Sequence, residues 1–393
     1  MNMDIRNRIF TVSVYSATHF LVDFACAFLM FRAISGTQNW YAYMLLYNFC
    51  AFAMQMPLGI IADKLSKNYL LAAVGCVLVA AAYAICGFPM AAYTFCGFQL
   101  AAVLAAGIGN AMFHIGGGID VLNVSDGKAG ALGIFVSPGA FGIYFGTIFG
   151  KIGIVPAIPN IFALFGNGGT AAAVPNVSAF FDNTGPSSAV TIVLALVAAA
   201  ALILFMRKAS GAAYPKNAPL SLAGGSSRRI LIAAACFFAV VCLRSFVGLT
   251  FNFPWKGIGN WGVALLCAVA FGKAAGGFVA DKFGATKTAC FTLGTASVLF
   301  LFSHLPAAGA AAMFLFNMTM PVTLWLTACK AFPGAKGFSF GLLTFALFLG
   351  YLPAYFGLRP PTGAAWPFAL AGAISLALLW IGLKGLKNER SVG

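Results

Sequence analysis

Twelve apolar runs, each about as long as a helix that crosses a bilayer, constrain this 393-residue chain more than any other feature. A helix needs about 20 apolar residues to span the hydrocarbon core. The chain is 61% hydrophobic and 8% charged, against about 25% charged in a soluble domain. This composition excludes a soluble enzyme, a disordered protein and a secreted disulfide module. The runs lie at residues 9–31, 40–61, 69–87, 92–117, 129–150, 187–206, 230–252, 258–279, 288–304, 307–328, 337–358 and 364–383.

The Lys and Arg residues lie mainly on one side of these runs. With the N-terminus inside the cell, 17 of the 23 face the cytoplasm, four face outside and two lie within spans. Because cytoplasmic loops are rich in Lys and Arg, we predict a multi-pass protein of the inner (plasma) membrane with both termini cytoplasmic. Topology and contact with anionic lipid then explain the formal charge of +15, and we expect no nucleic-acid partner. The 17 are Arg6, Arg8, Lys64, Lys67, Lys128, Arg207, Lys208, Lys216, Arg228, Arg229, Lys282, Lys287, Lys330, Lys336, Lys384, Lys387 and Arg390.

An internal repeat divides the chain into two halves. The sequence Gly59-Ile-Ile-Ala-Asp63-Lys64 follows the second run, and Gly277-Phe-Val-Ala-Asp281-Lys282 follows the eighth, at an offset of 218 residues. We predict six-helix halves at 1–206 and 230–393, joined by a basic cytoplasmic linker at 207–229. Parallel repeats of this kind are typical of one transporter class, in which the substrate site lies between the halves. Between the fifth and sixth runs, residues 151–186 are predicted to form a long external loop, with an interfacial or re-entrant piece at 153–165.

The repeated motif resembles the signature of the major facilitator superfamily. The resemblance implies an all-α membrane fold of twelve helices in two pseudo-symmetric six-helix bundles. It also implies that the motif Asp caps the N-terminus of a neighbouring helix and holds the cytoplasmic gate shut, a role suited to a carboxylate at a positive helix end. The gating residues are then Gly59, Asp63, Lys64, Gly277, Asp281 and Lys282.

Shorter motifs are similar to the fosmidomycin-resistance branch of that superfamily, whose members are exporters. They are His19-Phe-Leu-Val-Asp23, Phe113-His114 and Leu243-Arg244-Ser245-Phe246, although Ile115 stands where this branch has a Pro. The stretch from Gly133 to Gly142 is similar to the helix 5 signature of drug/proton antiporters. There Pro138 is expected to bend the helix and serve in gating, and ordinary small-residue helix packing is the alternative explanation.

Asp23 is the only carboxylate deep in an apolar run, and His19 lies one helical turn before it. A charge at the centre of a span costs about 2.5–3.5 kcal/mol on insertion scales, so such a residue normally faces a cavity or a partner. We predict that Asp23, His19 and His114 form the proton-coupling group. For His114 two roles stay open: relaying a proton towards Asp120, or a hydrogen bond to Asn110 where the helix ends. For His19 the alternative is a helix-helix hydrogen bond.

Arg244 lies at a similar depth in the seventh apolar run, residues 230–252, and is predicted to face Asp23 across the centre of the protein. It would pair with Asp23 or bind an anionic substrate through its planar fork of donors, and a permanent structural ion pair is the alternative. Asn110, Tyr47 and Asn317 are further predicted substrate-binding residues. Lys273 is expected to extend to the membrane interface.

The function predicted from these features is secondary active transport by alternating access. We expect a monomer that exports a small amphiphilic or anionic organic compound in exchange for protons. The alternatives are proton-coupled uptake of an organic anion or nutrient, a non-transporting membrane receptor, and copper transport through Met residues and His114. The chain shows no HExxH, paired carboxylates or Ser/His/Asp set, so we expect no enzyme activity. The ten Cys stand singly, and we expect no metal site and no cofactor.

Overall fold

The computed structural model describes residues 5–86, 96–152, 185–210, 220 and 227–387. The predicted loop at 151–186, with its piece at 153–165, lies almost wholly outside these residues, as does most of the predicted linker at 207–229. All regular structure in the described part is helical. Eleven described helices are long and apolar enough to cross a membrane, and Ala285–Leu301 is a shorter apolar helix. This agrees with the twelve runs and makes the chain a multi-pass membrane protein.

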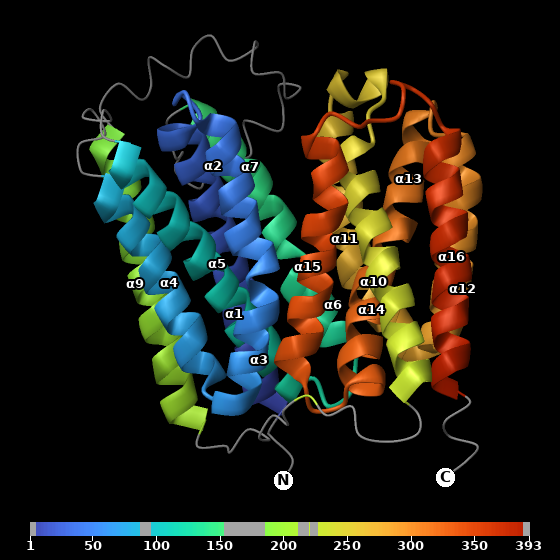
Figure 1. The fold of residues 1–393 in the computed structure, drawn as a ribbon, viewed down its shortest axis with the longest axis horizontal. Coiled ribbons are helices and arrows are strands. Elements are labelled where there is room, and N and C mark those ends of the chain that lie inside the picture. Colours follow the sequence, from blue (N-terminus) through green and yellow to red (C-terminus); the bar gives the residue numbers. More distant parts are fainter. Residues whose placement is uncertain (1–4, 87–95, 153–184, 211–219, 221–226, 388–393) are drawn as a thin grey trace.

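The helices form two bundles that stand side by side, the first half at one side and the second half at the other (Figure 1). The N-terminus, in the first half, and the C-terminus, in the second half, lie at the same end of the molecule, which we call the termini end. The described helices of the first half are α1 (Ile5–Leu29) with η1 (Met30–Ile34), α2 (Trp40–Asn48) with η2 (Phe49–Ala53), α3 (Gln55–Leu65), α4 (Asn68–Cys86), α5 (Cys96–Val124), α6 (Gly130–Val136), α7 (Pro138–Ile152) and α9 (Gly185–Ser210).

The second half repeats this arrangement, and its first helix follows the last helix of the first half after a short interval, since α9 ends at Ser210 and α10 begins at Ser227. The described elements are α10 (Ser227–Thr250), η4 (Pro254–Gly257), α11 (Trp261–Phe283), α12 (Ala285–Leu301), α13 (Pro306–Asn317), α14 (Thr319–Leu326), η5 (Thr327–Ala331), α15 (Lys336–Tyr355) and α16 (Trp366–Lys387).

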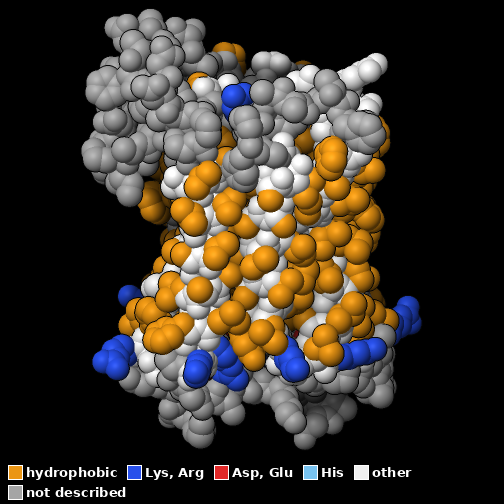
Figure 2. All heavy atoms as spheres, turned by 90° about the vertical axis from the view of Figure 1, so that its left-hand side faces the viewer, with side chains coloured by type: hydrophobic (Ala, Val, Ile, Leu, Met, Phe, Trp, Pro, Cys, Tyr) orange, Lys and Arg blue, Asp and Glu red, His pale blue; other side chains and the backbone are white. Residues whose placement is uncertain are grey.

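The outer surface matches a membrane environment. On the face of the first half shown in Figure 2, apolar side chains cover the middle of the molecule and Lys and Arg gather towards the termini end. Large apolar side chains such as Leu194, Phe205 and Phe291 are exposed on the outside of the bundles. In water such a surface would aggregate, whereas in a bilayer it contacts lipid. The charge asymmetry found in the sequence is therefore present in the folded molecule.

Several spans are interrupted near the centre of the protein. The fifth is broken at Ser137, between α6 and α7, where Pro138 begins the new helix. The tenth is broken at Met318, between α13 and α14, three residues before Pro321. The first, second and tenth also contain π-helical turns, which occur frequently at functional sites.

A row of glycines allows α7 to pack closely on α1. A side-chain carbon at Gly142 would overlap the carbonyl oxygen of Phe20, and one at Gly146 would overlap that of Phe24. Small residues permit backbones to approach in this way. Gly139, one turn earlier in the row, faces His19 and Asp23. This packing fixes the position of the candidate site between α1, α5, α6 and α7.

Candidate functional site

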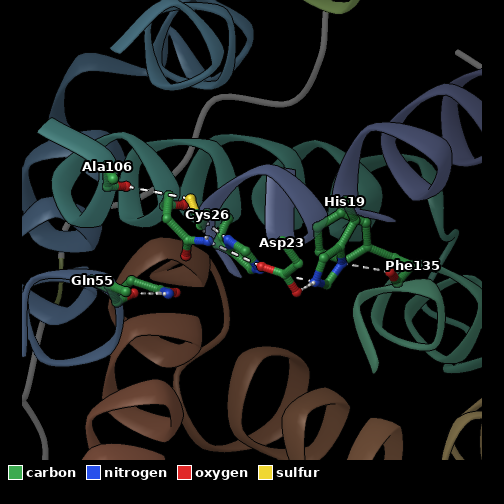
Figure 3. Close-up of polar contacts among 9 residues, drawn as sticks. His19, Asp23, Cys26, Gln55, Ala106 and Phe135 are labelled. Atoms are coloured by element: carbon green, nitrogen blue, oxygen red, sulfur yellow. Dashed lines mark hydrogen bonds and ion pairs between the residues drawn. The ribbon is translucent and has the colours of Figure 1, made fainter. Parts of the chain in front are cut away.

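His19 and Asp23 lie together in the interior of the first half (Figure 3), and His114 contacts both of them. His19 Nε2 is 3.2 Å from Asp23 Oδ2, and His114 Nε2 is 3.6 Å from Asp23 Oδ1. The two Nε2 atoms are 2.8 Å apart. All three residues are at most 7% exposed. The three residues predicted to handle protons are therefore in direct contact; we call them the His-Asp-His group.

The hydrogen-bond partners assign the ring tautomers. His19 Nδ1 is 2.7 Å from the carbonyl oxygen of Phe135, and His114 Nδ1 is 2.8 Å from that of Asn110. A carbonyl oxygen only accepts, so each Nδ1 carries a hydrogen and donates it. Each neutral ring then turns an unprotonated Nε2 towards the other. Two lone pairs at 2.8 Å repel, whereas one added proton converts the contact into a hydrogen bond, with Asp23 balancing its charge.

Residues beside the carboxylate extend this polar site towards α2. Asn110 Nδ2 donates to Asp23 Oδ1 over 3.0 Å and lies 3.8 Å from Cys26 Sγ. The Tyr47 hydroxyl in turn hydrogen-bonds with Cys26. Asn110 and Tyr47, both predicted substrate-binding residues, thus adjoin the His-Asp-His group. Cys26 was not predicted, because a Cys in an apolar run gives no signal that distinguishes it from a packing residue.

Two buried oxygens in this region have no hydrogen-bond partner among the residues that the structure describes. They are Asn110 Oδ1 and Gln55 Oε1. The amide nitrogen of Gln55, labelled in Figure 3, donates to the Ala51 carbonyl oxygen in the preceding η2 turn. Buried polar atoms in native proteins are nearly always satisfied by protein, water or ligand. These two oxygens are therefore free to accept a hydrogen bond from a water or from a polar group of a substrate.

The donor atoms of the His-Asp-His group lie within 4.8 Å of one another, close enough to hold one metal ion. Both Nδ1–H groups are also anchored to carbonyl oxygens, as in many metal-binding histidines. The contact of 2.8 Å between the Nε2 atoms is a hydrogen-bond distance, however, and it favours a shared proton. The prediction of no metal at this site stays a prediction.

Asp120, considered as the end of a proton relay from His114, lies in a separate cluster. Its carboxylate accepts hydrogen bonds from the Tyr15 hydroxyl over 2.7 Å and from Asn68 Nδ2 over 3.1 Å. The sequence suggested that the helix carrying His114 ends near that residue. In the structure this helix, α5, continues to Val124. His114 does hydrogen-bond Asn110, through the backbone carbonyl oxygen.

Arg244 does not pair with Asp23. Arg244 is 7% exposed and its Nε has no partner, and the ion pairs found among the described residues are those of Arg8 with Asp126, His19 with Asp23 and His114 with Asp23. The hypothesis of an Asp23–Arg244 salt bridge is therefore wrong for this conformation, because the two histidines and Asn110 already occupy the carboxylate.

Lys273 also differs from expectation. It lies in the middle of α11, partly buried, and interacts electrostatically with both Arg244 and Asp23. The α11 backbone at this residue packs against Gly133 of α6, where a side-chain carbon would overlap the Lys273 carbonyl oxygen. Lys273 is thus located where the two halves meet. The position of Lys273 along its own helix could not predict this location, because the neighbouring helix belongs to the other half.

The two motif carboxylates join the halves at the termini end. Asp63 accepts hydrogen bonds of 2.8 Å from the backbone N–H groups of Gly337 and Phe338, at the start of α15. Asp281 accepts bonds of 2.7 and 2.8 Å from Ala129 and Gly130, at the start of α6. Each carboxylate caps a helix of the opposite half, where the helix dipole favours negative charge.

The motif glycines allow these contacts to form. A side-chain carbon at Gly59 would overlap the Gly337 carbonyl oxygen, and one at Gly277 would overlap that of Ala129. Lys64 and Lys282 are both exposed, and the Lys282 ammonium lies over the Phe283 ring of its own helix. The structure therefore brings the glycines and carboxylates of the two motifs to the boundary between the halves, but not the lysines.

Other polar contacts across the boundary are also concentrated at the termini end. Trp325 Nε1 donates to the Gly127 carbonyl oxygen over 2.7 Å, and Lys336 Nζ donates to Asn123 Oδ1 over 2.7 Å. Beside them Arg8 binds Asp126 at 2.8 Å, and this hydrogen bond lowers the pKa of the Asp126 carboxyl. At the opposite end, the Tyr355 hydroxyl donates to the Tyr41 carbonyl oxygen. The described halves are thus joined most firmly at the termini end.

Two other predicted residues are placed by the helix breaks. Pro138 begins α7 directly after the break and precedes Gly139, so it lies next to the His-Asp-His group. Asn317 ends α13, and its side-chain amide donates to the Met313 carbonyl oxygen of the same helix. Asn317 is buried, but no described contact joins it to the His-Asp-His group.

Two solved structures are similar to the chain over almost its whole length. A Major Facilitator Superfamily transporter, FucP, in the outward conformation has a TM-score of 0.63 at 16% identity, covering 96% of this chain and 99% of that one. A variant of the E. coli fucose:proton symporter FucP has a TM-score of 0.61 at 16% identity, with the same coverage. No protein-family model and no curated protein matches the chain. At this identity the likeness concerns the fold, and the chain has the fold of Major Facilitator Superfamily transporters: two six-helix bundles, as the sequence predicted.

Proposed function

We propose that this chain is a proton-coupled secondary active transporter of a small organic compound, amphiphilic or anionic, that works by alternating access of its two halves. The observation that carries this proposal is the His-Asp-His group. Two Nε2 atoms at 2.8 Å, each turned to the other by a carbonyl-bound Nδ1, need one proton for a stable contact. A buried group that holds one proton at a time is suited to coupling.

The short helix α6 supports a route from this proton to the gate. Its first residue, Gly130, donates to Asp281 of the opposite half, and the carbonyl oxygen of Phe135 near its other end accepts from His19. Seven residues of helix span only about 10 Å. When the halves separate at the termini end, α6 loses its cap and the acceptor of His19 shifts. Proton exchange is then linked to the gate through one element.

The termini end is proposed to be the cytoplasmic side, because most Lys and Arg lie there. The gate formed by Asp63 and Asp281 would then be closed on the cytoplasmic side in this conformation, with Gly59 and Gly277 giving the close approach. We place the protein in the inner membrane as a monomer in contact with anionic lipid. Arg244, Asn110, Tyr47 and Asn317 are the proposed substrate-binding residues, and Pro138 is a proposed hinge.

Export is the direction that the resemblance to the fosmidomycin-resistance branch implies. Uptake is the second candidate function, and one of the proteins with the same fold is described as a fucose:proton symporter. Neither direction follows from the fold, since rocking of two halves serves both.

A transport assay in proteoliposomes tests the proposal. Vesicles with an imposed pH gradient and a panel of labelled neutral, cationic and anionic compounds should show accumulation that collapses with a protonophore. The matched control is a vesicle without a gradient, in which exchange but no accumulation is expected. Accumulation that persists with the protonophore, or that requires a transition-metal ion and is lost with a chelator, would contradict proton coupling.

A further inference from the structure

Arg244 and Lys273, the two deep cations of the second half, form no ion pair with any described residue. Arg244 is 7% exposed, and its Nε lacks any hydrogen bond. Neither residue takes part in the three ion pairs of the described chain. The two interact electrostatically with each other, so their like charges repel. Charged groups inside a membrane protein normally face a partner or a cavity.

The described carboxylates cannot supply the missing charge. Asp63 and Asp281 cap helices at the gate, and Asp126 binds Arg8. Asp120 accepts from Tyr15 and Asn68 in its own cluster.

Among the described carboxylates, Asp23 is the one that interacts electrostatically with Lys273, but its oxygens face His19, His114 and Asn110. With one proton on the histidine pair, Asp23 is neutralised locally. Two positive charges then remain without compensation in the centre of the protein.

We propose that Arg244 and Lys273 form a binding site for a dianion, either a dicarboxylate or a phosphate monoester. The Arg guanidinium offers a planar fork of donors that fits a carboxylate or phosphate group, and the Lys ammonium adds a second point charge. Two cations that interact electrostatically with each other match a ligand with two negative charges better than one with a single charge. This inference rests on the proposed function, because it takes the site to lie on the transport path, and it names the substrate class.

The same charges fix the sign of coupling to the proton. A dianion beside Lys273 adds negative charge near Asp23, which makes a protonated His-Asp-His group more favourable. By linkage, a proton on that group strengthens dianion binding to the same extent. Proton and dianion therefore favour each other's binding, and joint movement of the two would be symport. In a cell with an inward proton gradient, such symport would give uptake.

Binding to purified protein tests the site with defined probes. We expect succinate or glycerol 3-phosphate to bind at least tenfold more tightly than butyrate, and succinamide not to bind. Arg244→Gln should abolish binding, and Lys273→Gln should reduce dianion affinity to that of butyrate. Lys287→Gln, an exposed cation at the start of α12, is the matched control and should behave as wild type. Equal affinity for all four probes, or no binding by either dianion, would overturn the proposal.

Two further readouts do not depend on the choice of probe. If the cations are uncompensated, Arg244→Gln and Lys273→Gln should each raise the unfolding temperature of the ligand-free protein. A fall in both would mean that each is held by a structural partner, and the site would be withdrawn. Calorimetry in buffers of different ionisation enthalpy should show about one proton taken up per dianion bound, and none in Asp23→Asn.

The inference and the proposed function fail separately. Dianion binding with these properties, but without transport in vesicles, would support the dianion site and contradict the proposed transport function. Proton-coupled transport of a neutral compound, without dianion binding, would contradict the dianion site and support the proposed transport function.

Discussion

His19 and His114 each have a single ring nitrogen left for proton exchange, because a backbone carbonyl oxygen holds the other. Their exchangeable positions face each other and Asp23. Sequence spacing predicted the His19–Asp23 pair, since four residues make one helical turn. His114 was also predicted to handle protons, but spacing could not show its direct contact with His19, 95 positions away, because that contact depends on how α1 packs against α5.

At the residue scale, Asp23→Asn should abolish pH-driven accumulation. An amide cannot balance the charge of a proton held between the histidines, so the coupled proton is lost while substrate exchange without a gradient is partly retained. The measurement is uptake of labelled substrate with and without a pH gradient. Asp126→Asn is the matched control, because this carboxylate is exposed and binds only Arg8 in the described contacts. Normal pH dependence in Asp23→Asn would show that the proton is carried elsewhere.

At the element scale, α7 should tolerate no side chain at Gly139. A carbon there would overlap the His19 ring and the Asp23 carboxylate, so Gly139→Ala should displace the pair and lower coupled transport at least tenfold. The control is Gly248→Ala in α10, where nothing lies within 4 Å of the added carbon. Comparable activity in the two variants, at equal expression, would mean that α7 does not hold the His-Asp-His group in place.

The element α6 gives an asymmetry between two otherwise equivalent carboxylates. Asp63→Asn and Asp281→Asn each remove the negative charge from one helix N-terminus, at a cost of up to about 1 kcal/mol, so both should shift the protein towards an open termini end by up to about fivefold. Only Asp281 caps the helix that also binds His19. Asp281→Asn alone should therefore also change the pH dependence of transport.

Cysteine accessibility at the termini end reports opening in these variants, and a pH profile of transport reports coupling. Identical pH profiles for the two variants would contradict a link through α6. The internal repeat predicted both motif carboxylates, and the resemblance to the major facilitator superfamily implied their capping role. The sequence could not indicate which helix each carboxylate caps.

At the scale of the whole molecule, hydropathy and the repeat were sufficient for the fold. The twelve runs, the division into halves and the excess of cations at one end all follow from what a bilayer demands of a helix. The contacts between the halves were harder to predict from the sequence. Arg244 and Asp23 lie at almost the same distance along α10 and α1 from the helix starts, yet they do not pair. Depth alone does not give the side of a helix that meets its partner, which also explains the unexpected place of Lys273.

The most direct test is the distance between the two halves at the termini end, measured as a function of pH. Spin labels at Lys64 and Lys287, exposed residues of opposite halves, would report it by double electron-electron resonance in lipid nanodiscs. We expect a closed and an open population, and the ratio of the two should follow a one-proton titration curve as the pH changes. In Asp23→Asn the ratio should be independent of pH. An unchanged pH response in that variant, or a single distance at every pH in wild type, would contradict proton-coupled alternating access.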